Sequence, residues 1–380
     1  MKIAFRYRVM LKNKKNVDNI FVIDYNLTIK TNHKINMVAI HFNIKKQRKD
    51  IMLKMEDVAK LANVSTATVS RVLSNNKNVS HKTREKVLEI INQLEYKPNK
   101  LASNFRKKTS ETVAVILPDI ENPFFAEIIK GCRDEALKNG FHLLLCDTSN
   151  SVEQEKEFTE LVKERFVDGI ILATARMPKG EIYNLSQEIP VVLACEYVES
   201  YEIPTVSIDN VTAAREATEY LLDQGHKRIG IITGPLEVIV SRDRVKGYRQ
   251  ALLLRDIPVQ DFFIQEGDFS VKSGYDIMMK FLASEQKPTA IFASSDAMAL
   301  GALKACKNKG LRVPDDISII GFDDIPLCTL VEPELTTISQ PKYEMGCQAM
   351  KMLLNIIDKN DLQQKQIVLP HKLIIRQTTN

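Results

Sequence analysis

After Thr109, short apolar runs alternate with amphipathic helical stretches for about 270 residues. Runs such as 113–117, 169–173 and 290–293 are apolar at nearly every position, so both faces of each strand must be buried. Strands of this kind occur in parallel sheets that carry helices on both faces. The alternation therefore predicts an α/β core built from doubly wound parallel sheets.

This core region is large for one doubly wound sheet. We expect two similar subdomains with a cleft between them. The first comprises residues 111–209 and 340–360, and the second comprises residues 210–339 and 361–380. Such sheets bind ligands beyond the carboxyl ends of their strands, so the cleft is the predicted binding site.

Polar and aromatic side chains follow several of the apolar runs. Carboxylates and arginine can bond hydroxyl groups, and aromatic rings can stack on a sugar or a base. Each aspartate taken alone could be only a helix N-cap, but the shared position at strand ends favours a small hydroxylated ligand. These candidates are Asp119, Phe124, Phe125, Arg244, Asp296 and Asp323.

A second pattern lies before the core, in residues 53–73. It predicts two short helices separated by a break at 63–65, with Ser65 as the N-cap of the second helix. Small polar residues open that second helix. This arrangement is typical of a helix-turn-helix, which lays its second helix in the DNA major groove. The apolar positions of the pair are Met55, Val58, Ala59, Ala62, Val69, Val72 and Leu73.

The alternative is a helical hairpin that only packs against the rest of the protein. A third predicted helix from Ser80 to Leu94 favours the helix-turn-helix, since three small helices can close a core and two cannot. Its expected apolar face contains Val87, Leu88, Ile91 and Leu94. Together these helices define an all-α N-terminal domain over residues 52–98.

Charge is distributed unevenly along the chain. Residues 1–51 hold 12 Lys and Arg against 3 Asp and Glu, and residues 52–109 hold 12 against 5. Residues 110–380 hold 29 against 40, so the body is acidic although the whole chain is +5. A basic head on an acidic body is expected if only the head meets DNA phosphates.

Residues 1–51 are rich in Lys, Asn and Ile. The runs 19–25 and 37–42 could form strands, but the segment offers no core for them. Met52 stands directly before the helix-turn-helix. We therefore expect residues 1–51 to be an extension that is either not translated or poorly ordered. An additional DNA-binding arm is the weaker alternative.

Several classes of protein are disfavoured. No apolar run approaches the roughly 20 residues that span a bilayer, and no secretory signal pattern is present, so we expect a cytoplasmic protein without membrane contact. Six scattered cysteines lack metal-ligand spacing, so we expect no metal and no cofactor. Motifs for phosphate loops, dinucleotide binding and Ser or Zn hydrolases are absent, so we predict no catalytic residues.

The chain from about residue 53 to 380 resembles the lactose-repressor/galactose-repressor family of bacterial regulators. Many independent motifs agree, in order, which makes the resemblance specific. Residues 1–51 lie outside it. The motifs include Thr68-Val69-Ser70-Arg71-Val72-Leu73, Tyr96-Lys97-Pro98-Asn99, Asp168-Gly169-Ile170-Ile171, Ser295-Asp296-Ala297-Met298-Ala299-Leu300-Gly301 and Gly321-Phe322-Asp323-Asp324.

The resemblance implies a homodimer, with a tetramer as a further assembly, that binds a pseudo-palindromic double-stranded operator. It implies a hinge over residues 99–110 and an effector-binding and dimerisation core over 111–380, shaped like a periplasmic binding protein. Carried over by position, the residues that contact bases, phosphates or the minor groove would be Thr66, Ala67, Thr68, Ser70, Arg71, Asn75, His81, Ala102 and Phe105.

For the effector, the resemblance adds Cys195 and Glu196 to the candidates at the strand ends. Cys195 stands where sugar-responsive members often have Asp. The body is most similar to the cytidine-repressor branch, which implies a nucleoside or sugar effector. It also resembles the catabolite-control branch, for which the corepressor would be a phosphocarrier protein.

Two readings come from other functional classes. A solute-binding protein of a transporter would need a signal peptide and no basic head, and this chain has the reverse. A sugar- or nucleoside-processing enzyme on the same α/β scaffold would be revealed by turnover of such compounds. A DNA-binding repressor controlled by a small ligand is the function that the sequence predicts.

Overall fold

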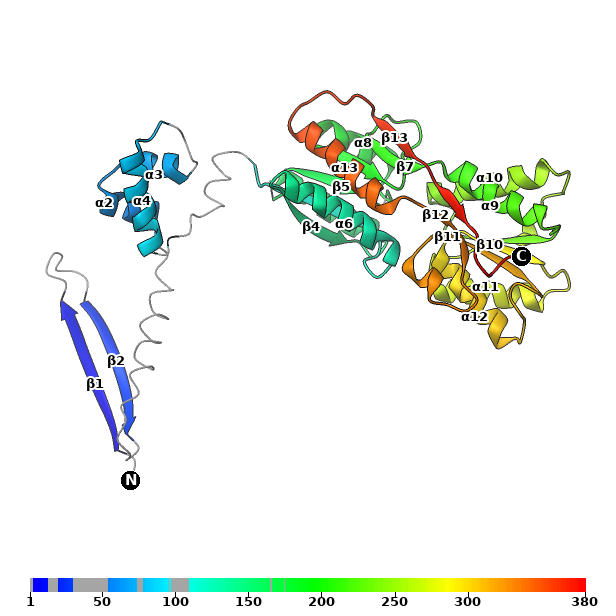
Figure 1. Ribbon diagram of the computed structural model, residues 1–380, viewed down its shortest axis with the longest axis horizontal. Coiled ribbons are helices and arrows are strands. Elements are labelled where there is room, and N and C mark those ends of the chain that lie inside the picture. The colour runs from blue at the N-terminus through cyan, green and yellow to red at the C-terminus, as the bar shows by residue number, and fades with distance from the viewer. Residues whose placement is uncertain are drawn as a thin grey trace. The chain divides into compact units, whose positions relative to one another are not determined.

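The computed structural model describes residues 3–12, 20–29, 54–73, 78–94, 96, 109–164, 166–173 and 175–380. For residues 3–12 and 20–29 it describes the backbone alone. The chain divides into two compact units, Met1–Asn99 and Lys100–Asn380, and each is a separate body (Figure 1).

Two strands lie in the N-terminal extension. β1 (Ile3–Lys12) and β2 (Ile20–Ile29) pair as an antiparallel hairpin, with Tyr7 opposite Tyr25. The run 19–25, a possible strand on the sequence pattern, falls largely within β2. The run 37–42 lies outside the described residues. That residues 1–51 are untranslated or poorly ordered stays a prediction.

The helix-turn-helix is formed as the sequence predicts. It consists of α2 (Met55–Ala62), α3 (Thr66–Leu73) and α4 (His81–Gln93). Val58, Ala62, Val69 and Val87 are completely buried among the three helices, and Tyr96 closes the core. Three helices thus bury one small common core.

One predicted core position of α4 was wrong. Leu88 is 42% exposed, whereas Ile90 and Ile91 pack on the core. Successive helical residues are rotated by about 100°, so a helix that buries Val87 and Ile91 turns Leu88 toward solvent.

Local capping fixes the tight turn between α2 and α3. Asn63 ends α2 in the left-handed conformation, with φ 53° and ψ 49°, a conformation that Asn tolerates. The Thr68 N–H donates to Ser65 Oγ at 3.1 Å, which makes Ser65 the N-cap as predicted. At the start of α2, the Lys54 N–H donates to the Asp57 carboxylate at 2.8 Å, so a carboxylate satisfies the helix start where a hydroxyl is absent.

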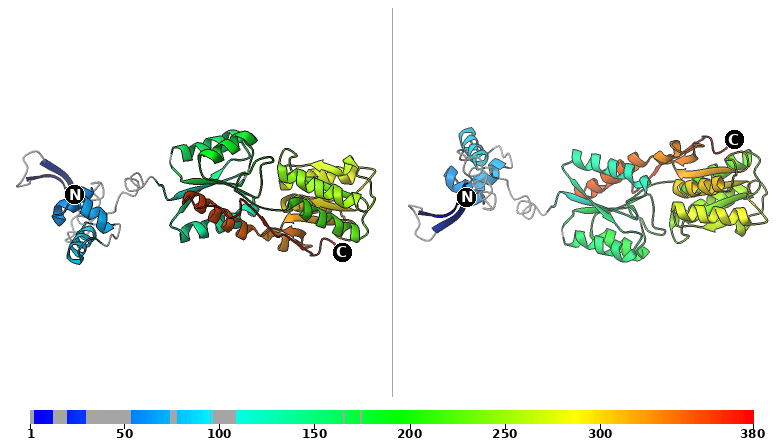
Figure 2. Two further views of the ribbon diagram at one scale, coloured as in Figure 1. Left: turned by 90° about the horizontal axis from the view of Figure 1, so that it is seen from above. Right: turned by 90° about the horizontal axis from the view of Figure 1, so that it is seen from below.

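The core unit contains two six-stranded sheets, each covered on both faces by helices (Figure 2). In the first subdomain all neighbouring strands are parallel, and α6 and α13 cover one face while α7 and α8 cover the other. The strand order is β13 (Gln366–Leu369), β7 (Thr205–Ile208), β6 (Val191–Ala194), β5 (Gly169–Leu172), β3 (Thr112–Leu117) and β4 (His142–Asp147). The helices are α6 (Pro123–Lys138), α7 (Val152–Lys163), α8 (Lys179–Glu188) and α13 (Lys342–Ile357).

The second subdomain repeats this plan, with one antiparallel strand, β14, at its edge. Its helices form the pairs α9 with α10 and α11 with α12. The strand order is β14 (Lys372–Ile374), β12 (Thr336–Ser339), β11 (Ser318–Asp323), β10 (Ala290–Ala293), β8 (Ile229–Thr233) and β9 (Ile264–Glu266). The helices are α9 (Asn210–Asp223), α10 (Ile239–Leu253), α11 (Val271–Ala283) and α12 (Asp296–Asn308).

The last crossing between subdomains lies later than the sequence predicted. Residues 361–380 had been assigned to the second subdomain, but β13 pairs with β7 in the first sheet, from Gln366 opposite Thr205 to Leu369 opposite Ile208. The chain therefore crosses between β13 and β14. The search for continuous apolar runs does not predict β13, because it is an edge strand in which exposed and half-buried residues alternate.

Glycines allow paired helices to approach closely. A Cβ on Gly131 of α6 would lie 2.1 Å from the Tyr343 carbonyl oxygen of α13, and one on Gly346 would lie 2.1 Å from the Ile128 carbonyl oxygen. A Cβ on Gly247 of α10 would lie 2.2 Å from the Val211 carbonyl oxygen of α9. Real Cβ atoms cannot occupy such positions without separating the helix backbones.

We therefore expect Gly131→Ala to lower the free energy of unfolding of the core by roughly 1–3 kcal/mol, because overpacking forces backbone shifts. Gly180→Ala is the matched control, since its Cβ would meet only the Tyr201 hydroxyl at 3.8 Å. Alanine there should be neutral or stabilise by up to about 1 kcal/mol. Urea unfolding followed by circular dichroism measures both, and equal effects would contradict the close crossing of α6 and α13.

Candidate functional site

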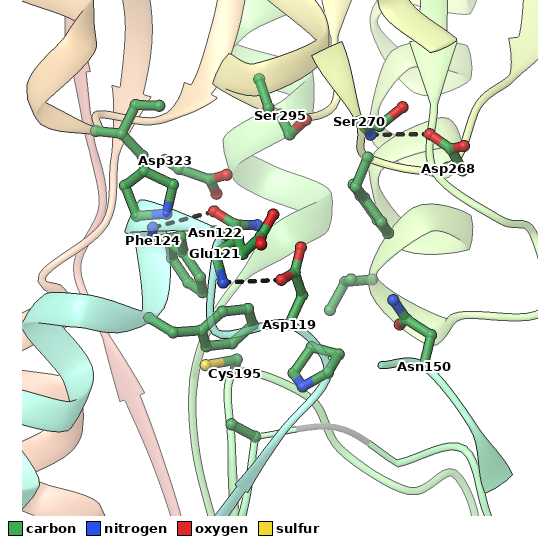
Figure 3. Close-up of a pocket in the computed structure, with 18 of the residues that line it drawn as sticks. Asp119, Glu121, Asn122, Phe124, Asn150, Cys195, Asp268, Ser270, Ser295 and Asp323 are labelled. Atoms are coloured by element: carbon green, nitrogen blue, oxygen red, sulfur yellow. Dashed lines mark hydrogen bonds between the residues drawn. The ribbon is translucent and has the colours of Figure 1, made fainter. Parts of the chain in front are cut away.

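A cavity of about 420 Å³ lies between the two subdomains, at the carboxyl ends of their strands. Loops after β3, β5 and β6 line it from the first subdomain, while α10, the start of α12 and the segments after β9 and β11 line it from the second. Figure 3 shows Asp119 and Cys195 of the first subdomain facing Asp268 and Ser295 of the second. The cavity is where the sequence predicted a ligand cleft.

Seven of the eight predicted effector residues line this cavity. The β3–α6 loop and the first turn of α6 contribute three of them. Asp119 Oδ1 accepts from the Glu121 N–H at 2.8 Å, and Asn122 caps α6 through the Phe124 N–H at 3.0 Å, which fixes the loop. Phe124 and Phe125 pack edge to face with ring centroids 5.0 Å apart. The seven are Asp119, Phe124, Phe125, Cys195, Glu196, Arg244 and Asp323.

Asp296 is the exception, and the structure gives it another role. It is completely buried, and its carboxylate points into the second subdomain. It accepts hydrogen bonds from the Thr337 hydroxyl at 2.6 Å, the Ile325 N–H at 2.9 Å and the Cys328 thiol at 3.1 Å. Asp296 itself does not line the cavity, whereas its neighbours Ser295 and Ala297 do. Asp296 therefore ties α12 to β12 and to the segment after β11.

Arg244 is held rigidly in the wall. Its Nε donates to the Asn210 side-chain oxygen at 3.0 Å, and Nη1 donates to the Ser294 carbonyl oxygen. The guanidinium stacks on the Phe322 ring, with Cζ 3.7 Å from the centroid. Arg244 is 6% exposed, and these contacts compensate for taking its charge out of water.

Asp323 ends β11 and is buried in the same wall, where it accepts from the Gln340 amide at 2.7 Å. Its φ of 118° is unusual for a residue other than glycine. The Lys342 ammonium donates to the Asp323 carbonyl oxygen at 2.6 Å and holds this backbone. Burial raises the pKa of Asp323 to about 7, and nearby Arg244 offsets only part of that rise.

An ion pair that the sequence did not predict forms one wall of the cavity. Arg176 follows β5 and Glu196 follows the neighbouring strand β6. Arg176 Nη1 and Nη2 donate to the two carboxylate oxygens of Glu196 at 2.9 and 3.1 Å, and both side chains are about nine-tenths buried. Such fork-to-fork pairs are among the strongest hydrogen-bonded ion pairs.

Glu155 of α7 fixes the segment that carries Arg176. It is completely buried, and its carboxylate accepts from the backbone N–H groups of Arg176 and Met177 at 3.1 Å. Burial raises the pKa of Glu155, while these backbone hydrogen bonds oppose the rise. The backbone from which the Arg176 side chain extends is therefore anchored to α7.

Cys195, at the end of β6, has a positive φ of 72°. Burial raises the pKa of its thiol well above the usual range, so Cys195 enters the wall as a neutral thiol. An aspartate at this position would bring a further negative charge beside Glu196. With cysteine here, this part of the wall is less polar than it would be with a carboxylate.

Other lining residues were missed by the sequence reading. Most follow a strand end, so the rule that found Asp119 and Asp323 could have found them too. Their short segments carried no pattern that separates a ligand contact from an ordinary loop residue. The polar and aromatic residues among them are Glu121, Asn122, Asn150, Arg176, Asp268, Phe269, Ser270, Ser295 and Gln340.

On the helix-turn-helix, the predicted DNA-contact residues that the structure describes lie on α3 or at the start of α4. Thr66, Ala67 and Arg71 are exposed, and Thr68 and Ser70 are half-buried. His81 is exposed and lies 3.4 Å from Glu85. Asn75, Ala102 and Phe105 lie outside the described residues.

In the described part of the chain, no group of His, Cys, Asp and Glu side chains could hold a metal ion. None of the helices within it has the length and apolarity needed to cross a membrane.

Removing the Asp296 carboxylate should destabilise the core. Asp296→Ala leaves three buried donors without an acceptor, so we expect the free energy of unfolding to fall by roughly 2–5 kcal/mol. Ser295→Ala removes only the N-cap bond to the Met298 N–H and should cost about 1 kcal/mol. Thermal unfolding compares the two. If Asp296→Ala cost no more than its neighbour, the internal role would be wrong.

Asp323 should make stability depend on pH. Folding raises its pKa from 3.8 to about 7, so between these values the native chain holds a proton that the unfolded chain has lost. The free energy of unfolding should therefore fall as pH rises through this window. Asp323→Asn should flatten that slope, whereas the exposed Glu121→Gln should not. Urea unfolding at pH 5, 6, 7 and 8, or about these values, measures it; an unchanged slope in Asp323→Asn would contradict the assignment.

Both units of the chain match known protein families. Residues 54–99 match the family model "Bacterial regulatory proteins, lacI family", and residues 110–377 match "Periplasmic binding proteins and sugar binding domain of LacI family". The HTH-type transcriptional repressor CytR of Escherichia coli (strain K12) is 42% identical over 337 residues, which cover 88% of this chain and 99% of that protein. Catabolite control protein A of Priestia megaterium is 40% identical over 325 residues, covering 85% and 98%.

Among solved structures, the Lac repressor dimer bound to operator and the anti-inducer ONPF is similar, with a TM-score of 0.77. It is 29% identical, and the match covers 86% of this chain and 99% of that one. The helix-turn-helix and the core of two α/β subdomains agree with these matches. The chain belongs to the lacI family of bacterial regulatory proteins.

Proposed function

We propose that this protein is a transcriptional repressor whose affinity for a pseudo-palindromic operator is set by a nucleoside or sugar in the cavity of the core. One observation carries the proposal: the same chain has a helix-turn-helix with an exposed polar helix and a cavity enclosed by two subdomains. The first supplies DNA recognition, and the second supplies control by a ligand.

The DNA-binding half rests on α3. Thr66, Ala67 and Arg71 are exposed on it, while Val69 and Val72 are buried beneath. A helix of this kind can place its N-terminal residues against base edges in the major groove. The operator-bound Lac repressor dimer, which is similar over 86% of this chain, supports a homodimer on two half-sites.

The ligand-binding half rests on the two walls of the cavity. A ligand that touches Phe124 on one wall and Asp268 on the other interacts differently with open and closed arrangements of the subdomains. Such differential binding shifts the equilibrium between arrangements. We propose that this shift changes how two copies present their helix-turn-helix domains to DNA.

The same proposal covers the remaining properties of the chain. The protein acts without catalysis and without a cofactor or metal, in the cytoplasm, as a homodimer that can associate further to a tetramer. The similarity to transcriptional repressors supports a binding role.

A second candidate is favoured by the 40% identity to catabolite control protein A. In that case a phosphocarrier protein, bound to the core, would be the corepressor. For such a partner the resemblance implies a basic residue at position 332. This chain has the exposed Glu332 there, which disfavours the second candidate. Addition of phosphocarrier protein to an operator-binding assay separates the two candidates.

Operator binding can be tested with the full chain. Duplexes selected from a random pool should be enriched in a pseudo-palindrome, and their affinity should fall steeply with salt. Titration with nucleosides, ribose and disaccharides should then change that affinity. No preference over random duplexes, with or without these compounds, would overturn the proposal.

Arg71→Ala should weaken operator binding by roughly 1–3 kcal/mol, since it removes a contact to a base or a phosphate. Ligand binding to the core should be unchanged. The exposed Arg312→Ala, which removes the same charge from the core, is the control. Fluorescence anisotropy with labelled operator compares the two variants, and an equal loss of affinity would contradict the role of α3.

A further inference from the structure

The cavity is lined by more negative than positive groups. Among its described lining residues, five carboxylates stand beside two guanidinium groups. Such a surface repels an anionic ligand unless a guanidinium is free to meet it. The state of the two arginines therefore decides what charge the cavity accepts. The carboxylates are Asp119, Glu121, Glu196, Asp268 and Asp323, and the arginines are Arg176 and Arg244.

Both arginines are already engaged. Arg244 donates to Asn210 and to the Ser294 carbonyl oxygen and stacks on Phe322, all within the second subdomain. Arg176 gives two parallel hydrogen bonds, at 2.9 and 3.1 Å, to the carboxylate of Glu196. A phosphate that took the place of Glu196 on the Arg176 guanidinium would have to break both hydrogen bonds of that pair.

We infer that the Arg176–Glu196 ion pair is the charge selector of this cavity, which neutralises the arginine so that uncharged nucleosides or sugars bind and their phosphates do not. This inference rests on the proposed effector function and deepens it. The pair is well placed for the task, because Glu196 is 6% exposed and lies in the wall next to Cys195.

Contacts behind the cavity wall fix the geometry of the Arg176–Glu196 ion pair. Glu155 holds the backbone N–H groups of Arg176 and Met177, and β5 and β6 are adjacent parallel strands, so the segments after them run side by side. Arg176 is thereby directed at Glu196 before any ligand arrives. A preorganised, bidentate pair exchanges its partner for a phosphate only at the expense of leaving a buried carboxylate unpaired.

What remains for a ligand is an aromatic and polar surface. Phe124, Phe125 and Phe269 offer ring faces or edges, while Asn150, Gln340 and Ser295 offer neutral polar groups. The outer carboxylates Asp119 and Asp268 accept hydrogen bonds from hydroxyl groups. An uncharged compound with a ring and several hydroxyls satisfies these groups, whereas a phosphate oxygen would meet acceptors of its own kind.

The wild-type protein can be tested directly. Isothermal titration of the full chain with the four ribonucleosides and with ribose should show binding of at least one, and its 5′-phosphate (5-phosphate for ribose) should bind at least about 100-fold more weakly. Equal affinity for a compound and its phosphate would overturn the inference.

Glu196→Gln provides the sharper test. It keeps the shape of the side chain but frees the Arg176 guanidinium, so the ratio of neutral to phosphorylated affinity should fall to less than about 10-fold. Glu157→Gln is the control, because it removes one exposed carboxylate of the same subdomain that does not line the cavity. It should leave that ratio within about threefold of wild type.

Thermal unfolding without ligand checks that each variant folds. A double variant that carries both Arg176→Gln and Glu196→Gln has an uncharged pair at this place. It should restore discrimination against phosphates, because position 176 then has no guanidinium. If the wild type binds none of the neutral compounds, the proposed effector class is wrong, and the inference falls with it. If it binds one and Glu196→Gln leaves the ratio unchanged, the inference alone is wrong.

Discussion

The carboxyl ends of two parallel sheets meet at one cavity, and the binding chemistry of the core depends on this arrangement. A parallel strand delivers its last residue and the following loop to the same edge as its neighbours. Because both subdomains turn that edge toward each other, residues far apart in the sequence, such as Asp119 and Asp323, line one space. The helices cover the sheets, and α6, α10 and α12 also supply lining residues such as Phe124 and Arg244.

Charge burial is the second constraint. Arg244, Glu196 and Asp323 are each 6% exposed, and such groups are tolerated only with partners. The cavity satisfies them within its own walls, through Asn210, Arg176 and Gln340 respectively. Arg244 with Asn210 and Glu196 with Arg176 are contacts within one subdomain, whereas Lys342 of α13 in the first subdomain donates to the Asp323 carbonyl oxygen in the second.

Much of the fold follows from local patterns. Apolar runs and helical periodicity predict the two sheets and the three-helix head, because each pattern is set within ten to fifteen residues, roughly one element. The edge strand β13 escaped, since its residues alternate between exposed and half-buried and lack a continuous apolar run. The segment Gln366–Leu369 was accordingly assigned to the wrong subdomain.

The site was harder to predict, for a physical reason. Sequence position places Asp296 at a strand end, but its direction is decided by Thr337 and Ile325, which are 41 and 29 residues away. The partnership of Arg176 with Glu196 likewise depends on β5 and β6 being neighbours, across 20 residues of sequence. Side-chain direction and pairing are tertiary properties.

The central claim is that the cavity and the helix-turn-helix are coupled. Its most direct test is operator affinity, measured by fluorescence anisotropy with the full chain during titration of a ligand that calorimetry shows to bind. The account predicts that operator affinity changes over the range of ligand concentration between its Kd for free protein and its Kd for DNA-bound protein, and levels off at saturation. An operator affinity that stays constant at saturating ligand would contradict it.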